Sequence, residues 1–315
     1  MRVETADRLK AVCIMLMIVG HCEIPQALHD FIYLFHIPMF FFIAGLFFRE
    51  ASPAVRLRKD TRQLLVTYLV GTLVVLLKYA ADGFRTSDFS VASHFVQSIF
   101  LVGPMGSSLL DGFFDVGPLW FLPALFFCRT FFNFGLRFFH SPWIPLILGF
   151  LFCVVSIPVV VPFGIEQGVS AMFYFGAGYF FSQEPGLSRW RGTLPVALIV
   201  ACTGFLVPPI DMHAGIYPMP VVSALASLGM VILLWKLAFL FESKTWIPLR
   251  LLSYCGKVSI MILLVHGTEA MAVDVCGKLC ELPLPLVVVV RVVFDVSIAC
   301  VLSRIAFVRK ILCLR

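Results

Sequence analysis

Three histidines stand inside strongly apolar stretches of this sequence: His21, His36 and His266. An ionisable side chain in hydrocarbon is costly, so each one is a candidate for function until a structural reason is found. An unperturbed histidine titrates at about 6.5, so imidazoles in a dry site suit proton transfer near neutral pH. Glu269 follows His266 by three positions and therefore shares its helix face, where it could orient the ring. His266 also lies near the outer end of its apolar stretch, so an interfacial position is the alternative interpretation.

A lysine accompanies the first of these histidines in the run DRLKAVCIMLMIVGH. Lys10 precedes His21 by eleven positions, which at about 100° per residue places both on nearly the same helix face, roughly 16 Å apart along the axis. One face would then offer a cation at the cytoplasmic rim and an imidazole near the middle of the membrane. The alternative is a snorkelling lysine and a histidine satisfied by a neighbouring helix.

Weaker candidates occur in two later apolar stretches. Arg291 and Asp295 are spaced i, i+4, which favours a structural ion pair within one helix. Arg129 could meet an anionic ligand from the cytoplasm, or its charge could simply snorkel to the interface. Cys276 and Cys280 lie near a loop without an accompanying histidine, so the sequence predicts no metal site.

The elements that position these residues must be membrane helices. Of the 315 residues, 60% are hydrophobic and 13% are charged, whereas a soluble domain carries roughly 25% charged residues. A spanning helix needs about 20 mostly apolar residues. The sequence predicts an all-α polytopic membrane protein, a single domain over 1–315, with about ten transmembrane helices. The predicted segments are 9–28, 31–48, 63–81, 117–138, 143–163, 165–183, 193–209, 219–241, 251–272 and 284–307.

The distribution of lysine and arginine predicts the orientation of these helices, because basic loops stay cytoplasmic. With the N-terminus inside, the inner loops carry 17 basic residues and the outer loops carry two, Arg85 and Lys278. Both termini are therefore expected in the cytoplasm, in a multi-pass protein of the inner or plasma membrane. Topology and anionic lipid account for the net charge of +6, which gives no indication of nucleic-acid binding. The stretch 82–116 is expected outside, as a cap over a cavity or as a solvated loop.

Several sequence blocks resemble those of one family of membrane enzymes. The basic residue, ten intervening positions and histidine from Lys10 to His21 resemble the signature of the acyltransferase 3 family. FHIPMFFFIAGLFF resembles the family's second-span block, PLWFLPALFF at 118–127 its mid-chain block, and LLSYCGKVSIMILLVH its late glycine-serine-histidine block. The likeness is to the branch described as fucose 4-O-acetylase-like. Lys10 stands where many members have arginine, and residues 82–116 and 205–250 match no family block.

The resemblance implies an O-acyltransferase that moves an acyl group, usually acetyl, from cytoplasmic acetyl-CoA to a hydroxyl of a glycan or lipid-linked saccharide. Acetyl-CoA would be a co-substrate, and no tightly bound cofactor is expected. His21 would act as general base or as the acyl acceptor, and His36 would bind the acceptor or stabilise the oxyanion, with His266 the third choice. Basic side chains on the cytoplasmic side would hold the nucleotide phosphates; these are Lys10, Arg56, Arg58, Lys59, Arg62 and Arg129.

Two other classes of protein fit the composition. A secondary transporter would use the buried histidines and acids as a proton relay, although the sequence has no inverted repeat. A structural membrane scaffold would tolerate substitution of His21 and His36. Acetyl transfer that depends on His21 separates the enzyme from both alternatives.

Overall fold

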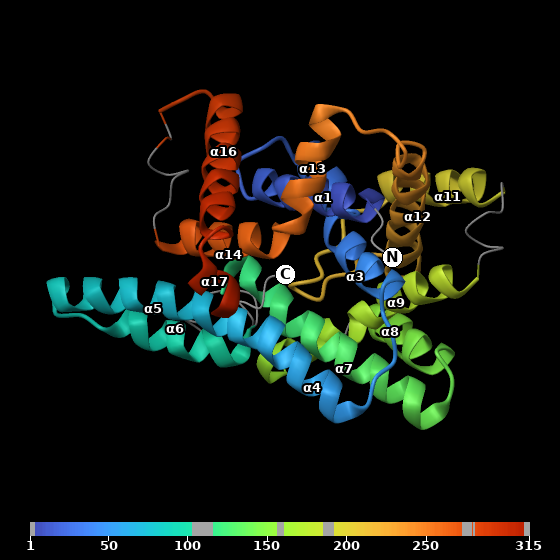
Figure 1. The fold of residues 1–315 in the computed structure, drawn as a ribbon, viewed down its shortest axis with the longest axis horizontal. Coiled ribbons are helices and arrows are strands. Elements are labelled where there is room, and N and C mark those ends of the chain that lie inside the picture. Colours follow the sequence, from blue (N-terminus) through green and yellow to red (C-terminus); the bar gives the residue numbers. More distant parts are fainter. Residues whose placement is uncertain are drawn as a thin grey trace.

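The structure is a computed structural model, and it describes residues 4–102, 116–155, 161–184, 192–272, 279 and 281–311. Over these ranges the chain is helical, apart from one isolated antiparallel bridge between Asp211 and Ile216. The all-α prediction is confirmed for this part of the chain. Figure 1 shows the helices packed into one bundle from which the α5–α6 pair protrudes.

The helices follow one another with short breaks. They are α1 (Glu4–Gly20), α2 (Gln26–Tyr33), α3 (His36–Leu46), α4 (Pro53–Asp60), the π-turn η1 (Thr61–Leu65), α5 (Val66–Thr86), α6 (Ser90–Leu101), the short 3₁₀ turn η2 (Gly117–Trp120), α7 (Phe121–Phe139), α8 (Trp143–Val155), η3 (Pro162–Gly164), α9 (Ile165–Gln183), α11 (Thr193–Cys202), η4 (Thr203–Leu206), α12 (Pro220–Phe239), α13 (Ile247–Lys257), α14 (Ser259–Ala272), α16 (Leu284–Leu302) and α17 (Ala306–Ile311).

Five helical stretches among the described residues are long and apolar enough to cross a membrane: Gln26–Leu46, Pro53–Thr86, Gly117–Phe139, Pro220–Phe239 and Leu284–Leu302. A sixth is obtained if α13 and α14, which meet at a bend of 69°, count as one broken span. Shorter apolar helices accompany them at Ser90–Leu101, Trp143–Val155 and Thr193–Leu206. Every predicted segment overlaps one helix or two consecutive ones, while the count of ten and the orientation stay predictions.

The stretch 82–116 differs from the expected loop. Helix α5 continues to Thr86, and α6 follows as an amphipathic helix that turns back along it, as Figure 1 shows. The Tyr68 hydroxyl donates a hydrogen bond to the Ile99 carbonyl oxygen at 2.7 Å and joins the two helices. Residues 103–115, including Asp111 and Asp115, lie outside the described residues. The buried Ala92, Phe95 and Ser98 of α6 explain why residues 90–101 pack against the bundle.

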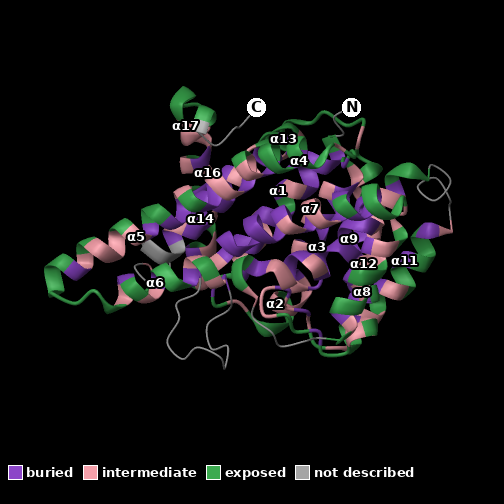
Figure 2. Cartoon of the chain, turned by 90° about the horizontal axis from the view of Figure 1, so that it is seen from below, coloured by how far each residue is buried: buried purple, intermediate pink, exposed green. Residues whose placement is uncertain are grey.

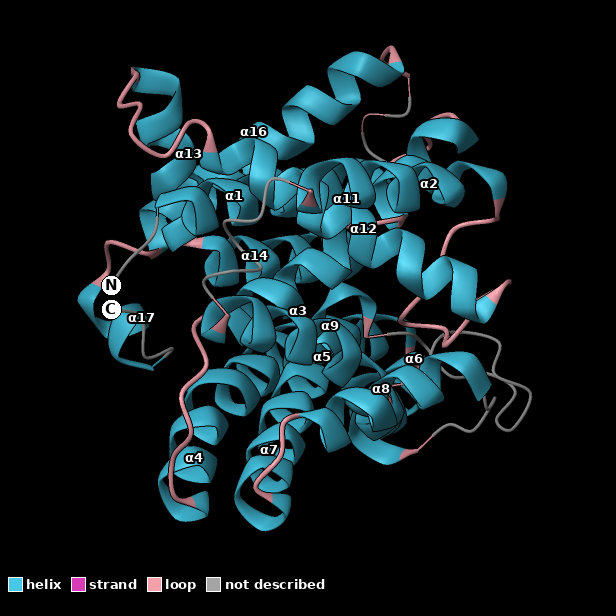
Figure 3. Ribbon diagram, turned by 90° about the vertical axis from the view of Figure 1, so that its right-hand side faces the viewer, coloured by secondary structure: helices cyan, strands magenta, loops and turns pink. Residues whose placement is uncertain are grey.

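The bundle has two distinct ends. The N-terminal end of α1, together with α4, α13 and α17, lies at one end, and α2 lies at the opposite end (Figures 2 and 3). We call these the α4 end and the α2 end. The start of α1 and the C-terminal helix α17 share the α4 end, and the side of the membrane on which they lie stays a prediction.

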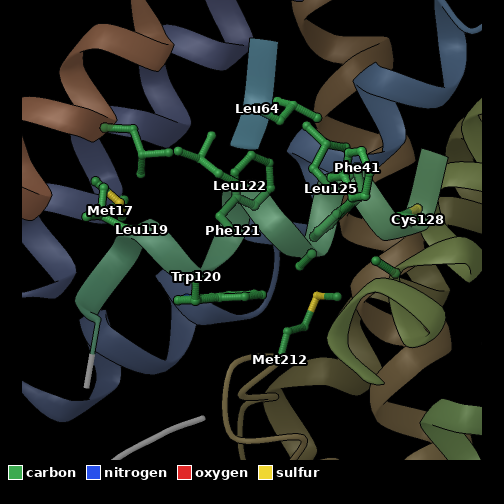
Figure 4. Close-up of a cluster of buried hydrophobic side chains, with 14 of the residues drawn as sticks. Met17, Phe41, Leu64, Leu119, Trp120, Phe121, Leu122, Leu125, Cys128 and Met212 are labelled. Atoms are coloured by element: carbon green, nitrogen blue, oxygen red, sulfur yellow. The ribbon is translucent and has the colours of Figure 1, made fainter. Parts of the chain in front are cut away.

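Large side chains fill the middle of the bundle around α7. Phe41, Phe132, Tyr174 and Phe175 are completely buried, and Figure 4 shows the part of this core that surrounds Phe121 and Leu122. The segment between η4 and α12, residues 207–219, also reaches inward. Its Ile210, Met212 and Tyr217 are buried, and Met212 lies beside Trp120 in Figure 4. This connection therefore contributes three side chains to the core, while its Pro208, Gly215 and Pro218 are exposed.

Two glycines let α3 and α9 touch backbone to backbone. A Cβ on Gly45 would meet the Phe175 carbonyl oxygen, and a Cβ on Gly178 would meet that of Phe42, in both cases far inside van der Waals contact. Close helix approach through small residues is a typical way to bind membrane helices together. Gly256 allows α13 to cross α1 at Asp7 in the same way. These crossings fix the register of the helices that carry the candidate site.

Candidate active site

A buried histidine–carboxylate pair joins α14 to α16. His266 Nδ1 lies 2.8 Å from Asp295 Oδ2, and neither side chain is accessible from outside the protein. Glu269, which the sequence suggested as the orienting group, is farther away, with its Oε2 3.6 Å from the same ring nitrogen. Asp295 thus orients the ring, and the burial of His266 rules out an interfacial position for it.

His21 lies against this pair, just beyond the end of α1. The centres of the His21 and His266 rings are 5.2 Å apart, with the ring planes tilted by 55°. The His21 Nδ1 atom lies 2.8 Å from the Met17 carbonyl oxygen of its own helix. In contrast to His266, the His21 side chain is exposed. Of the two contacting imidazoles, therefore, His21 belongs to the residue that is open to the outside.

His36 starts α3 and is the third predicted histidine at this place. It is buried, its Nδ1 lies 2.8 Å from the Ile32 carbonyl oxygen, and it is close enough to His21 for the two rings to interact electrostatically. The Tyr33 ring lies edge-on to it, with ring centres 5.0 Å apart. The structure thus brings all three predicted histidines together, with His21 in direct ring contact with His266.

The hydrogen bonds of these rings fix where their protons lie. A carbonyl oxygen only accepts, so the neutral rings of His21 and His36 carry their proton on Nδ1, and Asp295 favours the same tautomer in His266. Each Nε2 then presents a lone pair. The Nε2 of His266 is buried and has no hydrogen-bond partner within the described ranges. The cluster therefore offers basic nitrogens in a largely dry environment.

Arg291 connects the carboxylates of this cluster to the end of α1. Its Nε donates to Glu269 Oε2 at 3.0 Å, and its Nη1 donates to the His21 carbonyl oxygen at 2.9 Å. The same Nη1 lies 3.8 Å from Cys22 Sγ. The expected ion pair between Arg291 and Asp295 is not formed in the described structure, because each of the two side chains turns to a partner on α14. Arg291 instead holds the backbone of the exposed histidine in place.

The carboxylates of this cluster also have the spacing of a cation site. One ligand atom each from His266, Glu269 and Asp295 lies within 4.8 Å of the others. The three residues could therefore hold a metal ion, while Glu269 Oε2 already has the Arg291 guanidinium as its counter-ion.

A second charged cluster lies at the α4 end. Asp60 is completely buried, with Arg129 Nη2 3.1 Å from its Oδ1 and Arg56 Nη1 3.6 Å from its Oδ2. The Arg56 guanidinium also lies over the Phe48 ring, 4.3 Å from its centre, and donates to the Arg49 carbonyl oxygen. Two of the predicted phosphate-binding cations are therefore anchored by a carboxylate that the sequence analysis did not include.

The remaining predicted cations are divided between two places. Arg58, Lys59 and Arg62 are exposed on α4 and η1, next to the Asp60 cluster. Lys10 forms an ion pair of 2.7 Å with Asp7 on its own helix. The α4 end thus carries five cations around one buried carboxylate, which makes it a positively charged surface. Lys10 belongs to α1 and pairs there.

The segment 207–219 adds groups that the sequence gave no reason to select. His213 stacks on Trp120 with 5.0 Å between ring centres and 6° between planes, and its Nε2 lies 3.3 Å from the Val102 carbonyl oxygen. Gln167 donates to the His213 carbonyl oxygen at 3.0 Å. His213 lies within electrostatic range of His21. Only folding reveals these contacts, because no local pattern marks the segment.

The bundle and its clusters define a class of protein: a helical polytopic membrane protein with a histidine–carboxylate cluster at the end of α1 and a group of cations at the α4 end. The family described as an acyltransferase domain matches residues 4–304, nearly the whole chain. The chain belongs to this acyltransferase 3 family and is an acyltransferase. No curated protein and no solved structure matches it.

Proposed function

We propose that this protein transfers an acetyl group from acetyl-CoA to a hydroxyl of a glycan or lipid-linked saccharide, as in the fucose 4-O-acetylase-like branch that its sequence blocks resemble. The observation that carries the proposal is the contact between the ring of His21, an exposed residue, and the ring of His266, which Asp295 orients. An imidazole backed by a second oriented imidazole suits removal of a proton from an alcohol. Family membership favours this enzyme over the secondary-transporter alternative.

The chemical step follows from the proton positions. The acceptor hydroxyl approaches His21 Nε2, which removes its proton as the oxygen attacks the thioester carbonyl carbon. The tetrahedral intermediate collapses, the carbon–sulfur bond breaks, and the imidazolium returns the proton to the leaving thiolate of CoA. His266, oriented by Asp295, packs against the His21 ring and holds it in position during this exchange. The buried His36, which lies within electrostatic range of His21, would help to position the acceptor.

The donor would bind from the α4 end. Arg58, Lys59 and Arg62 are exposed there, and charge-assisted contacts of such groups with phosphates are strong. Arg56 and Arg129, held by Asp60, add positive potential behind them. The pantetheine arm would carry the thioester into the bundle towards His21. This requires the predicted topology, a single domain of ten spans in the inner or plasma membrane with both termini cytoplasmic.

The test compares two histidine variants of the purified protein in lipid nanodiscs, supplied with radiolabelled acetyl-CoA and membranes that contain acceptor. His21→Ala is expected to lower acetyl transfer by at least about 10³-fold, the range of a lost acid–base group. His140→Asn is the matched control, because His140 is exposed at the end of α7 with a left-handed backbone (φ 52°) that asparagine tolerates. Wild-type rates in His21→Ala would overturn the proposal.

Quenching the reaction before acceptor is added distinguishes the two roles of His21. A general base leaves no label on the protein. An acyl-histidine intermediate leaves acid-quenched label that depends on His21 and disappears when acceptor is added.

A further inference from the structure

Helix α2 carries a polar face directly beside the histidine cluster. Gln26, His29, Asp30 and Tyr33 are spaced i, i+3, i+4 and i+7, so they lie along one side of this helix. Gln26 is exposed, and the other three are partly exposed. On the opposite side, Ile32 is completely buried. The helix is therefore amphipathic, with its polar side turned away from the core.

The side chains of this face are joined to one another. The His29 and Tyr33 rings stack with 3.9 Å between centres and 22° between planes. The Gln26 amide donates to Asp30 Oδ1 at 2.6 Å, and the same oxygen lies 3.4 Å from His29 Nδ1. These contacts hold two rings, an amide and a carboxylate in a fixed arrangement at the α2 end.

The face continues into the candidate active site. The Tyr33 ring contacts His36 edge-on, and its Cε2 atom would lie 3.3 Å from a Cβ on Gly20. Gly20 is the residue before His21, and its missing side chain leaves the room that the Tyr33 ring occupies. A molecule held along α2 therefore has one end next to the imidazole that removes the proton.

The chemistry of this face selects a type of ligand. It contains no lysine or arginine, and Asp30 and the exposed Glu23 would repel phosphates, so the anionic part of CoA is disfavoured here. Carboxylate and amide groups bind neighbouring hydroxyls as acceptors and donors, while a ring stack offers an apolar edge to C–H groups. That combination suits a neutral polyhydroxylated ring, which is a saccharide.

Resting on the proposed function, we infer that the polar face of α2, formed by Gln26, His29, Asp30 and Tyr33, is the subsite that binds the saccharide acceptor. Acceptor and donor would then bind at opposite ends of the bundle. The cationic surface at the α4 end would bind the phosphates of CoA. The polar face of α2 would bind the saccharide. The reacting groups meet at His21.

The experiment measures where labelled acetyl goes in membranes of the source cell, whose own copy is deleted and replaced by a variant. These membranes supply the natural acceptor. Alkali-labile acetate in the saccharide fraction is compared with acetate released to water. For Asp30→Ala and for Tyr33→Leu we expect the ratio of saccharide-bound to released acetate to fall about tenfold. Leu28→Ala, an exposed change on the other side of α2, should keep the wild-type ratio.

Every outcome decides something. If His21-dependent labelling of saccharide occurs and both α2 variants keep the wild-type ratio, the α2 subsite is wrong while the proposed function survives. If His21-dependent label appears only in lipid or protein, the saccharide class is wrong. If no labelling depends on His21, the proposed function itself fails. If saccharide transfer and acetate release fall together, α2 supports the histidines structurally and does not bind the acceptor.

Discussion

Two buried carboxylates, one near each end of the bundle, have different neighbours and therefore different uses. Asp295 accepts a hydrogen bond from the imidazole of His266, a ring that has one donor and one acceptor nitrogen. Asp60 is set between Arg56 and Arg129, whose charges are permanent. A carboxylate beside a titratable ring can serve proton transfer, whereas one beside two guanidinium groups can only anchor a positive surface. Both carboxylates are buried, so their different roles come from the side chains that they contact.

The strongest way to break this comparison is Asp295→Asn. The change keeps the shape but replaces one carboxylate oxygen with an NH2 donor, which would face His266 Nδ1 and move the ring proton to Nε2, the wrong tautomer. The same change in a serine-protease triad costs about 10⁴-fold, and we expect a loss of about 10³-fold in kcat here. The measurement is acetyl transfer at saturating acetyl-CoA.

Two further variants separate orientation from folding at this position. Asp295→Glu keeps a carboxylate and should recover part of the lost rate. Asp60→Asn removes the other buried carboxylate and should leave kcat within about fivefold of wild type, because no proton passes through Asp60. Equal losses of kcat in Asp295→Asn and Asp60→Asn would contradict the distinction between the two sites.

Arg291→Met tests how much the buried ion pair between Arg291 and Glu269 contributes to stability. It leaves the buried Glu269 without its cation, and removing one partner of a buried pair costs about 3 kcal/mol or more. We expect a clearly lower temperature of thermal unfolding in detergent. The double variant Glu269→Gln/Arg291→Met removes both charges and should regain most of that stability. If the double variant is as unstable as Arg291→Met, packing and not charge explains the loss.

The cationic surface is tested by changing its exposed members together. Arg58→Ala, Lys59→Ala and Arg62→Ala in one protein should raise the KM for acetyl-CoA about tenfold, since each charge-assisted phosphate contact at a surface contributes about 0.5 kcal/mol. Acetyl-pantetheine lacks the nucleotide phosphates, and its KM should stay within twofold. A parallel rise for both donors would mean that these residues do not contact phosphate.

The smallest effect is expected at the family's basic position. Lys10 is paired with Asp7, so Lys10→Arg should change the KM for acetyl-CoA by less than about threefold. Titration of the initial rate with acetyl-CoA gives this value. A tenfold improvement would instead place Lys10 on the donor, with a guanidinium as the better ligand.

The free-energy cost of polar groups in hydrocarbon explains which site residues could be predicted from the sequence. His21, His36 and His266 stand out because an apolar segment has no reason to keep them, and the structure brings them together. The partners of these histidines could not be predicted from the sequence, because i, i+4 spacing relates residues within a single helix. Asp295 and Arg291 face α14, and a contact between helices far apart in the chain leaves no local periodicity.

The fold shows the same division between local and long-range information. The length of each apolar run correctly predicted a helix in every segment. It did not reveal the 69° bend between α13 and α14, the separate helix α2 or the helical nature of 90–101. Bends depend on backbone geometry and on neighbouring helices, which average hydropathy does not report. The buried segment around Met212 was missed for the same reason.

The position of α16 has a consequence for how the protein is made. It is the least buried of the five candidate spans, yet it supplies Asp295 to His266, 29 residues earlier in the chain, and Arg291 to the backbone of His21, 270 residues earlier. Until this late helix has been inserted, His266 lacks its carboxylate and the end of α1 lacks its guanidinium. In a nascent or truncated chain the histidine–carboxylate cluster is therefore incomplete. The enzyme can become active only when its synthesis is nearly complete.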